Sequence, residues 1–196
     1  MESLLKFSRL VDAVTERIGH AVYWLVLVAV LISAGNAVMR KAFNISSNAY
    51  LEIQWYLFAA VFLLLAGYTL LHNEHVRIDV ISSHYSTKVH LWIDIIGTVF
   101  FLFPITLLIL YYGWPYFWNS FVSQEWSPNP GGLIIWPAKM LIPLGFFLLL
   151  MQGISQLIKL IGALQGRVDP ATLIKSHGGP QEEVEELLTG LKDIKK

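Results

Sequence analysis

The chain has 196 residues, of which 55% are hydrophobic and 14% are charged, and its formal net charge is zero. Soluble domains carry about 25% charged residues, so the composition indicates an integral membrane protein, and the balanced charge gives no sign of nucleic-acid binding. The sequence contains no Cys, which excludes disulfides, thiolate metal sites, Cys-ligated iron–sulfur clusters and a Cys nucleophile in this chain.

Four apolar runs are long enough to cross a bilayer as helices, which takes about 20 residues. They cover residues 21–39, 51–71, 91–112 and about 135–161. We therefore predict an all-α integral membrane fold with four transmembrane helices. The membrane domain should cover residues 1–165, and a polar cytoplasmic tail should follow over 166–196.

The segment before the first run has two interpretations. Its apolar side chains recur at spacings of three and four, at Leu4, Phe7, Val11, Val14 and Ile18. This pattern indicates an amphipathic helix at the membrane surface or an extension of the first span, and it favours neither. The acidic residues in this segment are atypical of a cleaved signal peptide, so we expect the first run to remain as an uncleaved anchor.

The tail carries a second apolar pattern. Val184, Leu187, Leu188, Leu191 and Ile194 share one side of a predicted acidic helix over about 181–194. Such a helix is either a solvated tail or a docking element for a partner.

The positions of Lys and Arg predict the orientation. Basic residues are frequent in the N-terminal segment, in the second loop and after the fourth run, whereas the third loop, 113–132, has none. By the positive-inside rule both termini should be cytoplasmic. Arg40 and Lys41 in the first loop are the exception to this distribution.

Three charged residues lie within about a turn of the start of an apolar run: Glu52, Asp94 and Lys139. Interfacial placement explains them, because charged groups reach the membrane surface from such positions. Glu52 and Lys139 belong to the same side of the membrane, so an ion pair between them is the alternative. No chain of ionisable residues crosses the centres of the runs, and a scaffold or accessory subunit is therefore favoured over a carrier.

Small residues predict where the helices pack. Gly67 shares a face of the second run with Ala60, and Gly145 shares a face of the fourth run with Gly153. Helices in lipid associate at small residues because their backbones approach closely there.

The histidines allow two kinds of site. His72, His75 and Asp79 have a spacing that would place them on one helical face, but one His-x-x-His with one carboxylate is a weak metal signal. A haem held by two His is the stronger alternative, although haem ligands normally project into the interior of a bundle. The third interpretation is that these residues are interfacial and shape the second loop.

Several short motifs occur in a specific order. They are Glu52 at the start of the second run, Gly67 followed by His75, Arg77 and Asp79 in a His-Val-Arg-Ile-Asp-Val segment, and Trp126, Trp136, Lys139 and Gly145 in the last hairpin. Their order and spacing over about residues 10–165 resemble the small membrane subunit, of the DctQ type, of tripartite ATP-independent periplasmic (TRAP) transporters.

The resemblance implies a non-catalytic scaffold in the bacterial inner membrane, bound to a large permease subunit of the DctM type. That partner is expected to hold the substrate and sodium sites, so this chain needs no cofactor. A periplasmic binding protein of the DctP type is expected to deliver an organic carboxylate for symport. The motif residues are then candidate partner or structural contacts, with lipid around them. The alternative function is a haem- or quinone-binding membrane anchor of a redox complex.

Overall fold

The structure is a computed structural model that describes residues 2–45, 47–72, 86–169 and 173. Within these ranges all regular elements are helical, apart from one antiparallel bridge between Trp126 and Ile134. Four helical segments in this part are long and apolar enough to cross a membrane. The predicted all-α membrane fold is therefore confirmed. The predicted helix near 181–194 lies outside the described residues.

The first two long helices are α1 (Glu2–Phe43) and α2 (Asn48–Leu71). The third segment is continuous but is made of three elements, α4 (Thr87–Gly97), the π-helix η1 (Thr98–Leu102) and α5 (Phe103–Val122). The last is α6 (Trp136–Leu164). The third segment therefore extends past the expected span 91–112 at both ends, and Trp114 and Trp118 lie on a helix rather than in a loop.

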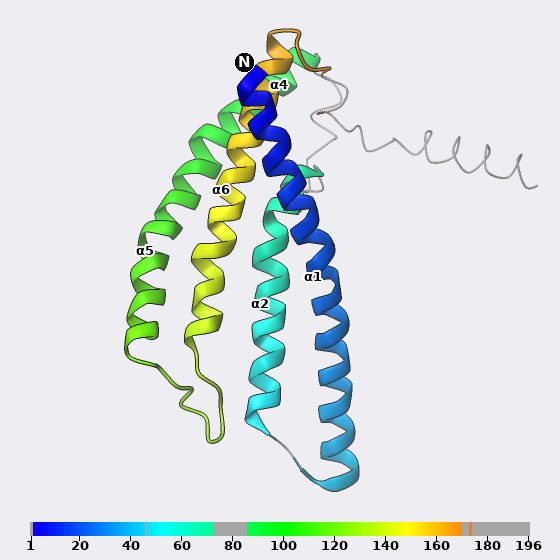
Figure 1. The fold of residues 1–196 in the computed structure, drawn as a ribbon, viewed down its shortest axis with the longest axis vertical. Helices are drawn as coiled ribbons and strands as arrows, with labels where there is room; N and C mark the ends of the chain where they lie inside the picture. Colours follow the sequence, from blue (N-terminus) through cyan, green and yellow to red (C-terminus); the bar gives the residue numbers. More distant parts are fainter. Residues whose placement is uncertain (1, 46, 73–85, 170–172, 174–196) are drawn as a thin grey trace, which may run out of the picture.

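The long helices lie beside one another in the order α5, α6, α2, α1 (Figure 1). α6 is central, because it contacts α1, α2, α4, η1 and α5. One end of the bundle holds the N-terminus and the end of α6, and we call it the N-terminal end. The opposite end holds the α1–α2 connection and the α5–α6 hairpin (Figure 1), and we call it the hairpin end.

α1 is one unbroken helix of 42 residues, which makes it about 63 Å long, roughly twice the hydrocarbon thickness of a bilayer. The segment with two interpretations is therefore an extension of the first span rather than a separate helix. Its buried residues include Ser8, Val11, Thr15 and Gly19, whereas Leu4, which belongs to the expected apolar face, is half exposed. Small and polar side chains make the contact because they allow close packing.

η1 lies directly before Pro104, which is at the start of α5. Proline lacks a backbone N–H, and in a regular α-helix its ring collides with the carbonyl one turn earlier. The π-turn relieves that conflict by widening the helix, and the N–H of Phe103 donates to the carbonyl of Thr98 five residues before it. The distortion at Pro104 thus takes the form of a π-turn.

α2 and α6 approach closely where Gly145 faces Leu63. A Cβ atom added to Gly145 would lie 2.7 Å from the carbonyl oxygen of Leu63. Gly67 makes a looser contact, since a Cβ there would lie 3.5 Å from the carbonyl oxygen of Leu148. Gly145 and Gly67 thus lie in packed regions between these helices, as small residues in a membrane helix pair should. Ala60 of α2 is buried as well.

Candidate functional site

Two clusters of hydrogen-bonded polar side chains lie at opposite ends of the bundle. At the hairpin end the cluster consists of Glu52, Tyr56, Glu125, Ser127, Asn129 and Lys139, and we call it the hairpin cluster. At the other end it consists of Ser8, Asp12, Thr15, Gln152, Ser155 and Lys159, and we call it the N-terminal cluster. Charged residues are absent from the helical stretches between the clusters, at 18–39, 53–71, 95–122 and 140–158.

The hairpin between α5 and α6 is built by local turn chemistry. Just after the end of α5, Gln124 takes the left-handed conformation, at φ 48°, and the N–H of Glu125 donates to the carbonyl of Ser120 at 3.1 Å. At the tip, Pro130 and Gly131 take the central positions of a turn in which the N–H of Gly132 donates to the carbonyl of Asn129. Gly131 has φ 70°, as the third residue of a type II turn requires.

Glu52 fastens this hairpin to the start of α2. The residue is only 4% exposed, and its carboxylate accepts hydrogen bonds from the Ser127 hydroxyl, from the Asn129 amide at 2.9 Å and from the Leu133 N–H at 2.6 Å. A Cβ atom on Gly132 would lie 2.8 Å from a Glu52 carboxylate oxygen, so glycine is needed for this approach. Because three donors of the hairpin bind it, the Glu52 carboxylate is the structural centre of the hairpin.

Lys139 closes the base of the same hairpin. Its ammonium group donates to the carboxylate of Glu125 and lies 4.2 Å from the centre of the Tyr116 ring. The hydrogen bond from Lys139 holds the pKa of the Glu125 carboxyl below its ordinary value of 4.5. The structure therefore gives Glu52 and Lys139 different partners, in place of the ion pair considered between them.

The two tryptophans of the hairpin motif differ in environment. Trp136 packs edge-on against Phe121, with ring centres 5.2 Å apart, and so ties the start of α6 to the end of α5. Trp126 is 65% exposed, although its backbone forms the bridge to Ile134. Trp136 is thus a structural contact, whereas the indole of Trp126 is available to a membrane surface or to another protein.

Replacing Glu52 by Ala should loosen the hairpin without unfolding the helices. The substitution leaves the donors of Ser127, Asn129 and Leu133 without their acceptor. We expect the Leu133 amide to exchange at least about tenfold faster, because it loses its hydrogen bond to the Glu52 carboxylate. Hydrogen–deuterium exchange of a peptide covering residues 127–135 measures this. The control is Glu2→Ala at an exposed helix start, and equal exchange in both variants would contradict the assigned role.

The Glu125–Lys139 contact should make the hairpin sensitive to acid. A carboxyl group with a lowered folded-state pKa contributes stability above its unfolded pKa, and this contribution is lost as pH falls through the folded value. For Glu125 the window therefore lies at and below pH 4.5. The thermal midpoint of the unaltered chain should fall toward that of Glu125→Gln as the pH is lowered from 6 to 3. If the midpoints of the unaltered chain and of Glu125→Gln differed by the same amount at every pH from 6 to 3, the Glu125–Lys139 contact would be contradicted.

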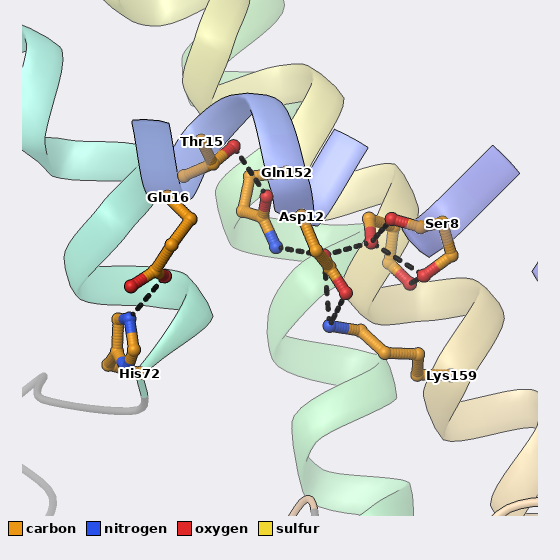
Figure 2. A network of polar contacts seen from close by, with 8 residues as sticks. Ser8, Asp12, Thr15, Glu16, His72, Gln152 and Lys159 are labelled. Carbon is orange, nitrogen blue, oxygen red and sulfur yellow. Dashed lines mark hydrogen bonds and ion pairs between the residues drawn. The ribbon is translucent and has the colours of Figure 1, made fainter. Parts of the chain in front are cut away.

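The N-terminal cluster joins α1 to α6 (Figure 2). Asp12 is at its centre, and its carboxylate accepts from Ser155 at 2.7 Å, from Gln152 at 2.9 Å and from Lys159 at 3.0 Å. The oxygen of the Gln152 amide accepts from the Thr15 hydroxyl at 2.8 Å. Because Gln152 is completely buried, satisfying both ends of its amide is necessary for stable packing.

A second contact in Figure 2 joins α1 to the end of α2. The Nε2 atom of His72 lies 2.8 Å from a carboxylate oxygen of Glu16, and the His72 ring lies 4.3 Å from that of Tyr68. His20 is close to Tyr68 as well, with ring centres 6.4 Å apart, and its side chain is 64% exposed. These histidines lie at the end of the bundle, in positions unlike those of haem ligands in a bundle interior.

Sequence reasoning missed the N-terminal cluster, although a signal for it was present. Ser8, Asp12 and Thr15 recur at spacings of four and three, and so do Gln152, Ser155 and Lys159 on α6. Two polar faces with matching periods predict two helices that hydrogen-bond to each other. Among the motif residues, His75, Arg77 and Asp79 lie outside the described residues, so the structure does not place them.

The contacts of the two clusters hold helices and the hairpin together. Within the described residues no group of three His, Asp or Glu side chains is arranged to hold a metal ion. The carboxylates at the cluster centres are occupied by donors from this chain. Fold and clusters together define a multi-pass helical membrane protein whose polar contacts fix the helix arrangement.

The comparison with protein families identifies this membrane protein further. The chain belongs to the family of the DctQ component of tripartite ATP-independent periplasmic transporters, whose family model matches residues 29–163. The matched stretch is more than half of the 196-residue chain and covers the hairpin cluster together with α2, α5 and nearly all of α6. Searches of curated proteins and of solved structures gave no significant match. The predicted resemblance is thereby confirmed.

Proposed function

We propose that this chain is the small permease subunit of a sodium-coupled TRAP transporter and acts there as a fixed scaffold for a large permease subunit of the DctM type. A periplasmic binding protein of the DctP type delivers an organic carboxylate to the complex. The substrate and sodium sites belong to the large subunit. The observation that carries this proposal is the family match over residues 29–163.

The distribution of charge supports a scaffold role. A carrier that binds sodium or a carboxylate within its own helices needs ionisable groups or broken helices near mid-membrane. Here the helical stretches between the two polar clusters carry no charged residue. Within each cluster, polar groups of one segment hydrogen-bond to polar groups of another segment. These bonds favour one fixed arrangement of the helices over a moving one.

The outward faces support a large apolar partner. Phe62 on α2 is 79% exposed, Tyr111 on α5 is 73% exposed and Trp24 on α1 is 69% exposed. Because these helices lie side by side around α6 (Figure 1), their outer faces are wide enough to contact lipid and a second membrane protein at once.

Co-purification tests the partnership. The full chain with an affinity tag, produced together with a TRAP large permease from the same source, should retain that permease through detergent extraction in a fixed ratio. A tagged membrane protein of similar size from another family is the control. Recovery of the permease at the level of this control would contradict the proposal.

The proposed orientation places both termini in the cytoplasm and the hairpin end in the periplasm. Because the sequence has no Cys, single-Cys variants report topology directly. In intact cells with a permeabilised outer membrane, Ser123→Cys should react with a membrane-impermeant maleimide. Ser3→Cys should react only after lysis. The opposite pattern would reverse the orientation.

A further inference from the structure

A cavity of about 470 Å³ opens between α2 and the α4–η1–α5 segment, with α6 as its floor. Phe146, Leu149, Gln156 and Leu160 of α6 line it, as do Leu70 of α2 and residues of the third segment, from Ile93 to Thr106. Its lining is mainly apolar, and its volume is in the range of ligand sites, roughly 300–1,000 Å³. None of the residues of the hairpin cluster or of the N-terminal cluster borders it.

Gln156 is the unusual residue of this cavity. The residue is only 4% exposed and lines the cavity, yet its side-chain amide forms no hydrogen bond or ion pair with any other residue that the structure describes. The nearby hydroxyls of Thr98 and Thr106 differ, since they donate to carbonyls of their own helix at 2.8 Å and 2.7 Å. Gln152, one turn earlier on α6, bonds Thr15 and Asp12.

An amide without a partner is unfavourable in this environment. Water is scarce at membrane depth, so a polar group that is unsatisfied there keeps its full desolvation cost. A buried amide that lines a cavity is therefore best explained by an acceptor or donor that a bound molecule supplies. Apart from Gln156 the polar lining residues are Asp94, Thr98 and Thr106, and all other side chains of the lining are apolar, which suits a molecule whose remaining part is a hydrocarbon chain.

The dimensions fit a chain that lies along the membrane normal. From Phe146 to Leu160 the floor is about 21 Å long at 1.5 Å per residue, somewhat more than half of the roughly 30 Å hydrocarbon thickness. Gln156 lies about 12 Å before the end of α6 at Leu164. The amide is thus near the interfacial end of the cavity, at the N-terminal end of the bundle.

We propose that this cavity binds one acyl chain of a membrane phospholipid, with the amide of Gln156 donating to the ester carbonyl of that chain. The headgroup then lies at the membrane surface near the start of α4, where Lys88 is exposed and available to the lipid phosphate. The bound lipid fills the space beside the π-turn and links α2 to the third segment. This inference does not depend on the proposed transport function.

Photo-crosslinking tests the site in the full chain. The protein is reconstituted into vesicles of phosphatidylethanolamine that carry a diazirine in one acyl chain, and labelled peptides are identified by mass spectrometry. We expect labelling of the cavity residues of α6 and of the third segment. The ratio of this labelling to labelling at the exposed Phe62 should fall about fivefold or more in Gln156→Leu.

A second variant fills the cavity. A Cβ atom added to Gly97, which lines the cavity, has no atom within 4 Å, so Gly97→Leu should occupy the space without a clash and should remove most of the cavity labelling. Ile161→Leu, at an exposed position of α6 outside the cavity, is the matched control and should leave the ratio unchanged. One phospholipid retained per unaltered chain in native mass spectrometry supports the site even if a variant unfolds.

Three results would overturn the proposal. The first is a labelling ratio that neither Gln156→Leu nor Gly97→Leu changes. The second is loss of cavity labelling when the large permease is added, because a helix of that partner would then occupy the space. The third is loss of the label when a quinone is added at a few mole per cent, which would assign the cavity to a quinone.

Discussion

Replacement of Gly145 by Leu should separate α2 from α6 and lower the free energy of unfolding by about 3 kcal/mol or more. A Cβ atom at this position would lie 2.7 Å from both the carbonyl oxygen and the Cβ atom of Leu63. A backbone oxygen cannot rotate away as a side chain can, so the helix axes must move apart. The unfolding midpoint in detergent, followed by tryptophan fluorescence, measures this loss.

Gly35→Leu is the matched control for this substitution. Both glycines are inside long apolar helices, so the change in helix propensity is the same, but a Cβ atom on Gly35 meets nothing within 4 Å. Gly67→Leu should fall between the two, because its nearest contact is at 3.5 Å. Equal midpoints for Gly145→Leu and Gly35→Leu would refute the close approach of α2 and α6.

Replacement of Asp12 by Leu should cost about 3 kcal/mol, because it removes the acceptor shared by Ser155, Gln152 and Lys159. The ammonium group of Lys159, with its side chain only 16% exposed, would then be left as an uncompensated charge. Asp12→Asn keeps one oxygen acceptor and should cost less. Unfolding in mixed micelles at increasing denaturing detergent measures these differences.

A double substitution separates the stranded charge from the lost hydrogen bonds. Lys159→Met removes the ammonium group, so Asp12→Leu with Lys159→Met should be more stable than Asp12→Leu alone. Additive costs for the two changes would mean that the residues do not interact. Ile161→Met, which is on the same helix and exposed, controls for the new methionine.

Both large effects concern contacts that hold α6 in place, and the sequence predicted only part of them. Gly145 and Gly67 could be predicted as packing positions because small residues recur at helical spacing in apolar runs. The partner of Gly145 could not be predicted, since spacing within one helix says nothing about the register of its neighbour. Leu63 opposite Gly145 is known only from the three-dimensional arrangement.

The polar contacts show the same division. The sequence placed Glu52 and Lys139 at one end of the bundle, with an ion pair between them as the alternative to simple interfacial placement. The choice of partners depends on the turn at Asn129–Gly132, which brings Ser127, Asn129 and the Leu133 N–H to Glu52. Lys139 then donates its hydrogen bond to Glu125 instead. A side chain's partner is decided by loop geometry at the scale of single ångströms, which charge patterns do not encode.

The N-terminal segment shows where a correct pattern leads to an incomplete prediction. The period of Leu4, Phe7 and Val11 predicted a helix, and α1 is helical there. The face that packs buries Val11 together with Ser8 and Thr15, and the hydroxyls of Ser8 and Thr15 meet Ser155 and Gln152 of α6. Leu4 and Phe7 remain exposed. In water the apolar face would be buried, but in a membrane protein lipid can cover it, and the polar face needs the protein partner.

Transport measured with and without this chain tests the central claim most directly. Vesicles are reconstituted with the large permease, the matching binding protein loaded with a labelled organic carboxylate, and an inward sodium gradient. Uptake should require this chain, fall at least about tenfold when it is omitted, and be reduced by Gly145→Leu but not by Gly35→Leu. Uptake that is unchanged when the chain is omitted would contradict its role as the small subunit that the transporter needs.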